Sequence, residues 1–66
     1  MKIQLNGETY ESPAPITVAG LLEQLEIHGT RVAVELNLDI LPKDKYATTA
    51  LREGDRVEVV HFVGGG

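Results

Sequence analysis

The chain has 66 residues, of which 42% are apolar and 24% are charged, and its net charge is −4. A chain of this length forms one domain that buries only about 60% of the surface exposed in the unfolded state, which leaves little interior for an active-site cavity. The excess of ten acidic over six basic residues disfavours nucleic-acid binding, and the absence of cysteine excludes disulfides, thiolate nucleophiles and cysteine metal sites.

The N-terminal segment has the pattern of a β-hairpin. Ile3 and Leu5 alternate with polar residues, Asn6-Gly7 tolerates the positive φ angles of a two-residue turn, and residues 8–11 return. The segment lacks the apolar stretch of a signal peptide, and no run in the chain approaches the ~20 apolar residues of a membrane span. We therefore expect a hairpin over residues 2–11, in a cytoplasmic protein that does not associate with membranes.

A helix is predicted to follow. Residues 12–15 contain two prolines and cannot form the interior of a strand, and Thr17 is a suitable helix N-cap. Gly29 is the expected end of the helix. Apolar residues at helical spacing form one stripe, which comprises Val18, Leu21, Leu22 and Leu25.

The second half of the chain contains further strands. Residues 32–37 alternate between apolar and polar side chains, and residues 40–41 are predicted to form a short additional strand. Residues 42–49 lack a clean periodicity and predict a loop that can hold one helical turn. Tyr46 and Leu51 are the expected apolar anchors of this loop.

The strongest strand signal spans residues 56–62, which are rich in β-branched side chains, and Glu53-Gly54-Asp55 before it is a turn without a catalytic role. A hairpin, one crossover helix and further strands are typical of the α+β class and of the β-grasp fold. This fold is a mixed sheet of four or five strands, with the helix packed on one face and the first and last strands parallel at the centre. The predicted sheet core comprises Ile3, Leu5, Val32, Val34, Val57 and Val59.

The chain ends in Gly64-Gly65-Gly66, directly after the apolar run of residues 57–63. We predict a folded domain over residues 1–63 and a flexible tail over residues 64–66. A tail without Cβ atoms can enter a channel too narrow for other residues. Its terminal carboxylate is a poor acylating agent until an enzyme activates it, so the pattern indicates a substrate of enzymes. A frayed terminus without function is the alternative.

A glycine tail supplies few contacts of its own, so a partner must also bind the folded body. If Val57 and Val59 face the helix, alternation places Val60 and Phe62 on the opposite, solvent-facing side. Together with Val63, these side chains form the predicted docking surface.

Other polar residues are weaker candidates. His61 has no evident orienting carboxylate, and His28 lies near the expected helix end, so neither is assigned to catalysis or to a metal site. The chain has no phosphate-binding loop and no carboxylate pair at a plausible cleft, which argues against an enzyme. The acidic residues form either a docking surface or a solvated exterior; they are Glu23, Glu26, Glu53, Asp55 and Glu58.

Several segments together resemble one family. They are Asn6-Gly7, the helix segment TVAGLLEQL, the strand VAVELN, the turn EGD and the ending VEVVHFVGGG. Over essentially the whole chain they are similar to the ThiS family of sulfur carriers in thiamine biosynthesis. More loosely the chain resembles the molybdopterin-synthase small subunit and ubiquitin, and the likeness to ubiquitin is architectural. The chain departs from the diglycine end of these families in having three terminal glycines.

The resemblance implies a reaction cycle. An E1-like enzyme uses ATP and magnesium to adenylate the Gly66 carboxylate, and the carrier itself binds no cofactor. A sulfur donor, either a cysteine desulfurase or a persulfide carrier, then converts the adenylate to a thiocarboxylate. Thiazole synthase receives the tail and takes the sulfur for the thiazole ring. Gly64 and Gly65 supply reach.

Three alternatives remain open at the level of sequence. The chain could carry sulfur for molybdopterin, cysteine or tRNA thiolation. It could be a ubiquitin-like modifier that forms isopeptide bonds. It could also be a noncatalytic β-grasp interaction module whose glycines are incidental.

Overall fold

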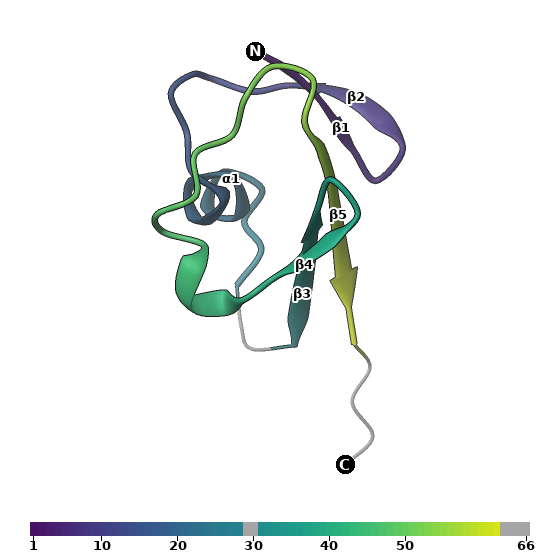
Figure 1. Cartoon of the computed structure of the whole chain (residues 1–66), viewed down its shortest axis with the longest axis vertical. Coiled ribbons are helices and arrows are strands. Elements are labelled where there is room, and N and C mark those ends of the chain that lie inside the picture. The colour runs from purple at the N-terminus through teal and green to yellow at the C-terminus, as the bar shows by residue number, and fades with distance from the viewer. Residues whose placement is uncertain (29–30, 63–66) are drawn as a thin grey trace.

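The computed structural model describes residues 1–28 and 31–62. These residues form a five-stranded mixed sheet with one α-helix against one of its faces (Figure 1). The predicted α+β class and β-grasp fold are confirmed. The strands are β1 (Lys2–Leu5), β2 (Glu8–Glu11), β3 (Val32–Leu36), β4 (Asp39–Leu41) and β5 (Arg56–His61); the helix α1 spans Val18–Gln24, and a 3-10 helix, η1, spans Lys43–Lys45.

The strand order across the sheet is β2-β1-β5-β3-β4, so the last strand of the chain lies at the centre. β1 pairs with β5 in parallel, as predicted, and the remaining neighbours are antiparallel. In Figure 1 the lower half of β5 extends away from β1 and β2.

The turn between β1 and β2 has the predicted conformation. Asn6 and Gly7 both have positive φ angles, 49° and 83°, and Leu5 pairs with Glu8 across the turn. Two positive φ angles in a two-residue loop twist the hairpin in the direction that paired strands require. The sequence pair therefore sets the register of the first hairpin.

The turn between β3 and β4 also has two consecutive positive φ angles, but one of them falls on a leucine. Asn37 and Leu38 have φ angles of 53° and 75°, and Leu36 pairs with Asp39. The Asn37 side chain stabilises this turn, because its Oδ1 accepts the Arg56 N–H at 2.9 Å and its Nδ2 donates to Asp55 Oδ1 at 3.1 Å. Leu38 has a Cβ that disfavours positive φ, and its side chain is 71% exposed.

Replacing Leu38 with glycine is expected to raise the free energy of unfolding by about 0.5–1 kcal/mol, since it relieves the left-handed strain without removing buried contacts. Urea denaturation measures this change. Leu38→Ala, which keeps the Cβ, is the matched control and should change stability much less. A less stable glycine variant would mean that the Leu38 side chain contributes packing that outweighs its strain.

Helix α1 begins where the sequence predicts. Thr17 is the N-cap, and its hydroxyl accepts the Gly20 N–H at 3.1 Å. The apolar stripe faces the sheet, with Val18, Leu21 and Leu22 buried. The cap and the stripe together set the start and the rotation of the helix.

The predicted end of the helix was wrong. The helix ends at Gln24, well before Gly29, and Gly29 itself lies outside the described residues. Glu26 adopts the left-handed conformation at φ 58° that a glycine usually supplies. Its N–H donates to the Glu23 carbonyl at 3.0 Å, and the Ile27 N–H donates to the Leu22 carbonyl at 2.9 Å, which satisfies the helix end. Ile27 then packs against the core, and this contact favours the early stop.

The core lies between α1 and the sheet. It comprises Ile3, Val18, Leu21, Leu22, Val32, Val34, Leu51, Val57 and Val59. The predicted sheet core is confirmed, except that Leu5 is only half-buried. The loop after β4 contains the expected helical turn, and Leu51 and Tyr46 anchor it as predicted, the first buried and the second partly buried against the core.

The loop is also hydrogen-bonded to the start of α1. The Val18 N–H donates to the Thr49 carbonyl at 2.9 Å, and the Leu51 N–H donates to the Ile16 carbonyl at 2.9 Å. Helix, loop and sheet therefore form one unit. Over residues 1–28 and 31–62, no helix is long and apolar enough to cross a membrane.

Candidate functional site

β5 presents two exposed apolar side chains close to the end of the described chain. Val57 and Val59 are buried toward α1, whereas Val60 is 47% exposed, and Phe62, directly after the strand, is 49% exposed. The predicted orientation of Val60 and Phe62 is confirmed. The remaining predicted site residues lie outside the described part of the chain; these are Val63, Gly64, Gly65 and Gly66.

The strand that carries these side chains is held from both sides. β3 pairs with it over its whole described length, and the Phe62 N–H donates to the Arg31 carbonyl at 2.9 Å beyond the strand end. On the other side the Asn6 N–H donates to the Val57 carbonyl at 2.9 Å, and Asn6 Oδ1 accepts the Val59 N–H at 2.7 Å. Hydrogen bonds to both neighbouring segments therefore fix the position of β5.

Asn6 has a second role that the sequence analysis missed. Its amide oxygen takes the position that the next backbone carbonyl of β1 would occupy if the strand continued. In the sequence, only the residue type pointed to this role, because asparagine tolerates positive φ and also carries a side-chain acceptor. Only the parallel pairing of β1 with β5 shows which N–H it reaches.

The solvent-facing side of the sheet combines apolar and acidic side chains. Val60 lies opposite Ala33 in the register, and in the next row Glu58 lies opposite Glu35, which in turn lies opposite Ile40 on the edge strand. Ile40 is 75% exposed and was not among the predicted docking residues. We call Glu35, Ile40, Glu58, Val60 and Phe62 the solvent face.

Two carboxylates of the solvent face lie opposite each other on neighbouring strands. Glu35 and Glu58 are directly opposite each other and half-buried, and within the described residues neither forms a salt bridge. Like charges at opposed positions of two strands destabilise a sheet. The solvent face therefore combines apolar side chains with two carboxylates, and the exposed Arg56 lies two residues before Glu58 on the same side of β5.

Most of the other acidic residues serve the fold or lie elsewhere. Glu53 Oε1 accepts the Lys2 N–H at 3.0 Å, and Asp55 Oδ2 accepts the Arg52 N–H at 2.8 Å, so both belong to the predicted turn. Glu23 and Glu26 are exposed at the end of α1. The acidic residues considered from the sequence thus do not form one surface.

The histidines are not part of a catalytic or metal-binding arrangement in the described structure. His28 and His61 are exposed, and residues 1–28 and 31–62 contain no group of three histidine, cysteine, aspartate or glutamate side chains that could hold a metal ion. His61 pairs with Val32 through the strand register, which is a structural position.

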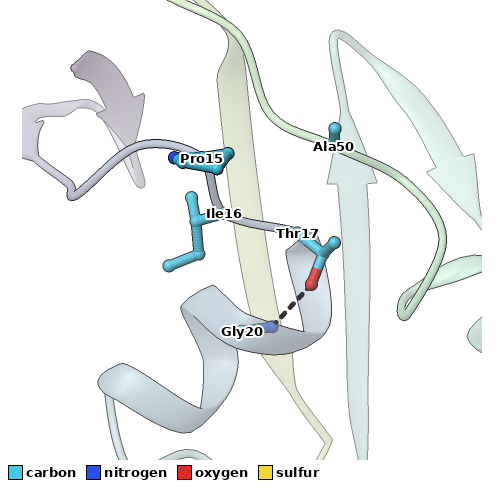
Figure 2. Close-up of a pocket in the computed structure, with 5 residues that line it drawn as sticks. All are labelled: Pro15, Ile16, Thr17, Gly20 and Ala50. Atoms are coloured by element: carbon cyan, nitrogen blue, oxygen red, sulfur yellow. Dashed lines mark hydrogen bonds between the residues drawn. The ribbon is translucent and has the colours of Figure 1, made fainter.

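Two shallow pockets lie away from the end of β5. One is lined mainly by apolar atoms of Pro15, Ile16, Thr17, Gly20 and Ala50, and the Thr17 hydroxyl is engaged by the Gly20 N–H (Figure 2). None of these side chains is titratable, so the pocket offers no acid–base group.

The other pocket is lined by Asn37, Leu38, Gly54 and Arg56, at the start of β5. Arg56 is the first residue of β5 and His61 is the last, so this pocket lies one strand length away from the end of β5, at a rise of ~3.3 Å per residue. The pocket holds one cationic side chain and no nucleophile or carboxylate. Neither pocket therefore has the residues of an active site.

The fold and the described residues define a class, that of small β-grasp proteins in which the central C-terminal strand precedes a glycine-only end. The ThiS family profile matches residues 3–66. The chain belongs to the ThiS family.

Relatives of two kinds are similar to the chain. Two thiazole synthases, from Paramagnetospirillum magneticum and Magnetococcus marinus, are 47% and 46% identical over all of its residues, and the chain spans only 20% of the length of each. The sulfur carrier protein ThiS of Bacillus subtilis is 37% identical over 97% of the chain and 98% of its own length. The crystal structure of the thiamine biosynthesis protein ThiS from Geobacter metallireducens superposes with a TM-score of 0.85 at 32% identity, with both chains fully covered.

Proposed function

We propose that the chain is a sulfur carrier of thiamine biosynthesis, in which the Gly66 carboxylate is adenylated and then converted to a thiocarboxylate. Family membership and the similarity to the Bacillus subtilis sulfur carrier support this function. The single observation that carries it is the position of β5, a central strand that is hydrogen-bonded on both sides and is followed in the sequence, after Phe62 and Val63, by three glycines.

The chemistry needs two partners before sulfur can be delivered. In the first step the carboxylate attacks the α-phosphorus of ATP on an E1-like enzyme, which supplies magnesium, and pyrophosphate leaves. In the second step a persulfide from a cysteine desulfurase or a persulfide carrier attacks the acyl carbon and AMP leaves. A thiol then reduces the sulfur–sulfur bond, which releases the thiocarboxylate. Because the first step consumes ATP, the proposal places the cycle in the cytoplasm.

In this proposal the chain presents its terminal carboxylate to the enzymes and catalyses none of the steps itself. Three extended glycines span about 10 Å, so the acyl carbon can reach into an enzyme while the folded body stays outside. Ordering each glycine costs roughly 1–2 kcal/mol, so binding must be driven by the body, and the solvent face is the surface that can supply it. Thiazole synthase is the proposed recipient, because two enzymes of that name contain a domain similar to this chain.

An intact-mass measurement tests the function. The chain is incubated with the E1-like enzyme, ATP, magnesium and a persulfide donor, and its mass is expected to rise by the difference between sulfur and oxygen. Omission of ATP is the control. An unchanged mass, under conditions that load another ThiS carrier, would favour a noncatalytic module. Attachment to lysines of other proteins would favour a ubiquitin-like modifier.

Phe62→Ala is expected to weaken binding to thiazole synthase by about tenfold or more, because a half-exposed aromatic ring, close in sequence to the glycines, is a typical interface anchor. The thermal midpoint should change little. Binding is measured by calorimetry, and Leu38→Ala, an exposed leucine outside the solvent face, is the matched control. A melting temperature that falls together with affinity would mean that Phe62 stabilises the fold, and the docking role would be withdrawn.

A further inference from the structure

β5 has an open edge immediately before the tail. The Phe62 N–H donates to the Arg31 carbonyl and the Asn37 N–H donates to the Arg56 carbonyl, so even-numbered residues of β5 direct their backbone groups toward β3. The backbone groups of Val57, Val59 and His61 therefore point to the other side of the strand.

On that side the pairing ends halfway along β5. β1 occupies the positions up to Val57, and the Asn6 side chain then takes the Val59 N–H at 2.7 Å. The chain turns away at Asn6-Gly7 into β2, and Figure 1 shows no strand beside the lower half of β5 on the side away from β3. The hydrogen bonds of the described residues include none to the Val59 carbonyl or the His61 N–H.

We propose that this open edge, the backbone of Val59–His61, binds an extended segment of thiazole synthase, which adds to the sheet where β1 ends. The proposal rests on the proposed function and names the surface through which the sulfur recipient grips the carrier. In this mode of recognition, main-chain hydrogen bonds give affinity and the neighbouring side chains give specificity.

The edge lacks the features that protect a strand from pairing. Edges are usually blocked by proline, by lysine or arginine, or by a covering loop, and residues 59–62 are Val-Val-His-Phe. An unprotected stretch in the middle of a sheet exposes the domain to wrong partners. Its closeness in sequence to the glycine tail supports the proposal that a partner strand occupies it.

Thiazole synthase is the occupant that the observations favour. A glycine tail offers only backbone groups, so the enzyme that admits it must bind it through main-chain contacts, and Val59–His61 precede the glycines by only a few residues in the sequence. Two thiazole synthases contain a domain similar to this chain, which links the domain to that enzyme. A second copy is disfavoured, since each copy has a charge of −4 and a half-buried Glu58 beside the edge.

The test removes the N–H that His61 offers at the edge. His61→Pro deletes the donor that points away from β3, and proline is tolerated in a strand where its nitrogen faces away from the ladder. His61→Ala is the matched control, because it removes the imidazole and keeps the N–H. The dissociation constant for the thiazole synthase encoded in the same genome is measured by calorimetry, and each variant is first melted to show that it folds.

The affinity of His61→Ala for thiazole synthase is expected to lie within about twofold of that of the unmodified chain. His61→Pro is expected to bind about tenfold more weakly, because it loses an interfacial hydrogen bond and disturbs the adjacent one. Equal affinities of the two variants would overturn the docking edge. If His61→Pro does not fold, hydrogen exchange of the unmodified chain decides the question.

In the free chain the His61 amide should exchange rapidly, while the Val60 and Phe62 amides, which face β3, are protected. Thiazole synthase should then slow exchange at His61 by at least about tenfold. An unchanged rate at His61 in the complex would overturn the proposal, as would a dimer of the chain in which His61 is already protected.

The failures of the two proposals are distinguishable. A chain that gains sulfur, but whose His61→Pro and His61→Ala variants bind equally well, overturns the docking edge and leaves the carrier function in place. A chain that protects His61 on binding thiazole synthase, but never gains sulfur, overturns the carrier function and leaves the docking edge in place.

Discussion

Deletion of Gly66 is expected to reduce sulfur loading by at least about 100-fold, since a displacement of only 1 Å in the position of a reacting group can cost that factor. The deletion moves the terminal carboxylate back by one residue, ~3.5 Å in an extended chain. The fold should be unaffected, because the core lies within residues 3–59. The measurement is the rate of mass gain with the E1-like enzyme, ATP and a persulfide donor.

Two further chains define what Gly66 does. A synthetic chain with an amidated C-terminus keeps the full reach and has no carboxylate, so it should not be loaded at all. Leu38→Ala leaves the tail intact and should load at the unmodified rate. A chain lacking Gly66 that loads at the full rate would show that a Gly65 carboxylate is equally competent, and the assignment of Gly66 as the reacting residue would fail.

Leu21→Ala is expected to lower the free energy of unfolding by about 2–5 kcal/mol, because the Leu21 side chain is fully buried between α1 and the sheet. Domains have a total free energy of unfolding of roughly 0.05–0.15 kcal/mol per residue. For a chain of this length, the total is of the same order as the expected loss. A substantial part of the variant population should therefore be unfolded at room temperature. Urea denaturation followed by far-ultraviolet circular dichroism measures the loss.

Ile40→Ala is the matched control for the core substitution. Ile40 is also a large aliphatic residue, but its side chain is 75% exposed, so its truncation should change stability by no more than about 0.5 kcal/mol. If Leu21→Ala and Ile40→Ala lost the same stability, the packing of α1 on the sheet would not be the main contact that stabilises the fold.

The solvent face and the open edge of β5 make complementary contributions to the proposed interaction. The solvent face offers the apolar side chains Val60 and Phe62 beside the carboxylates of Glu35 and Glu58. The open edge offers the backbone groups of Val59 and His61, a few residues before the glycines in the sequence. A partner that uses both would fix the position of the body and the direction of the tail, and this positioning is what delivery of a terminal sulfur atom requires.

Local patterns in the sequence were sufficient for several elements. Asn6-Gly7 predicted the first hairpin because positive φ at two consecutive residues is a property of those residue types. Thr17 predicted the start of α1 because a hydroxyl can cap the N–H groups of the next turn. The alternation in β5 predicted that Val60 and Phe62 are exposed, since side chains on a strand point to opposite faces in turn.

Other features depended on contacts between distant segments. The end of α1 at Gln24 was missed because Glu26 adopts positive φ, which a glutamate disfavours locally, while Ile27 packs on the core. The turn at Leu38 was missed for the same reason: Asn37 hydrogen bonds to residues 55 and 56 hold a leucine in a conformation that its own Cβ opposes.

By itself the sequence determined the β-grasp order of elements, the apolar stripe of α1 and the exposed side chains of β5, because periodicity, caps and turns are interactions within a few residues. Only the tertiary structure decided the acidic pair of Glu35 and Glu58, the acceptor role of Asn6 and the open edge at His61. These features arise from the register between strands that are far apart in the chain, and register is set by the packing of the whole sheet against the helix.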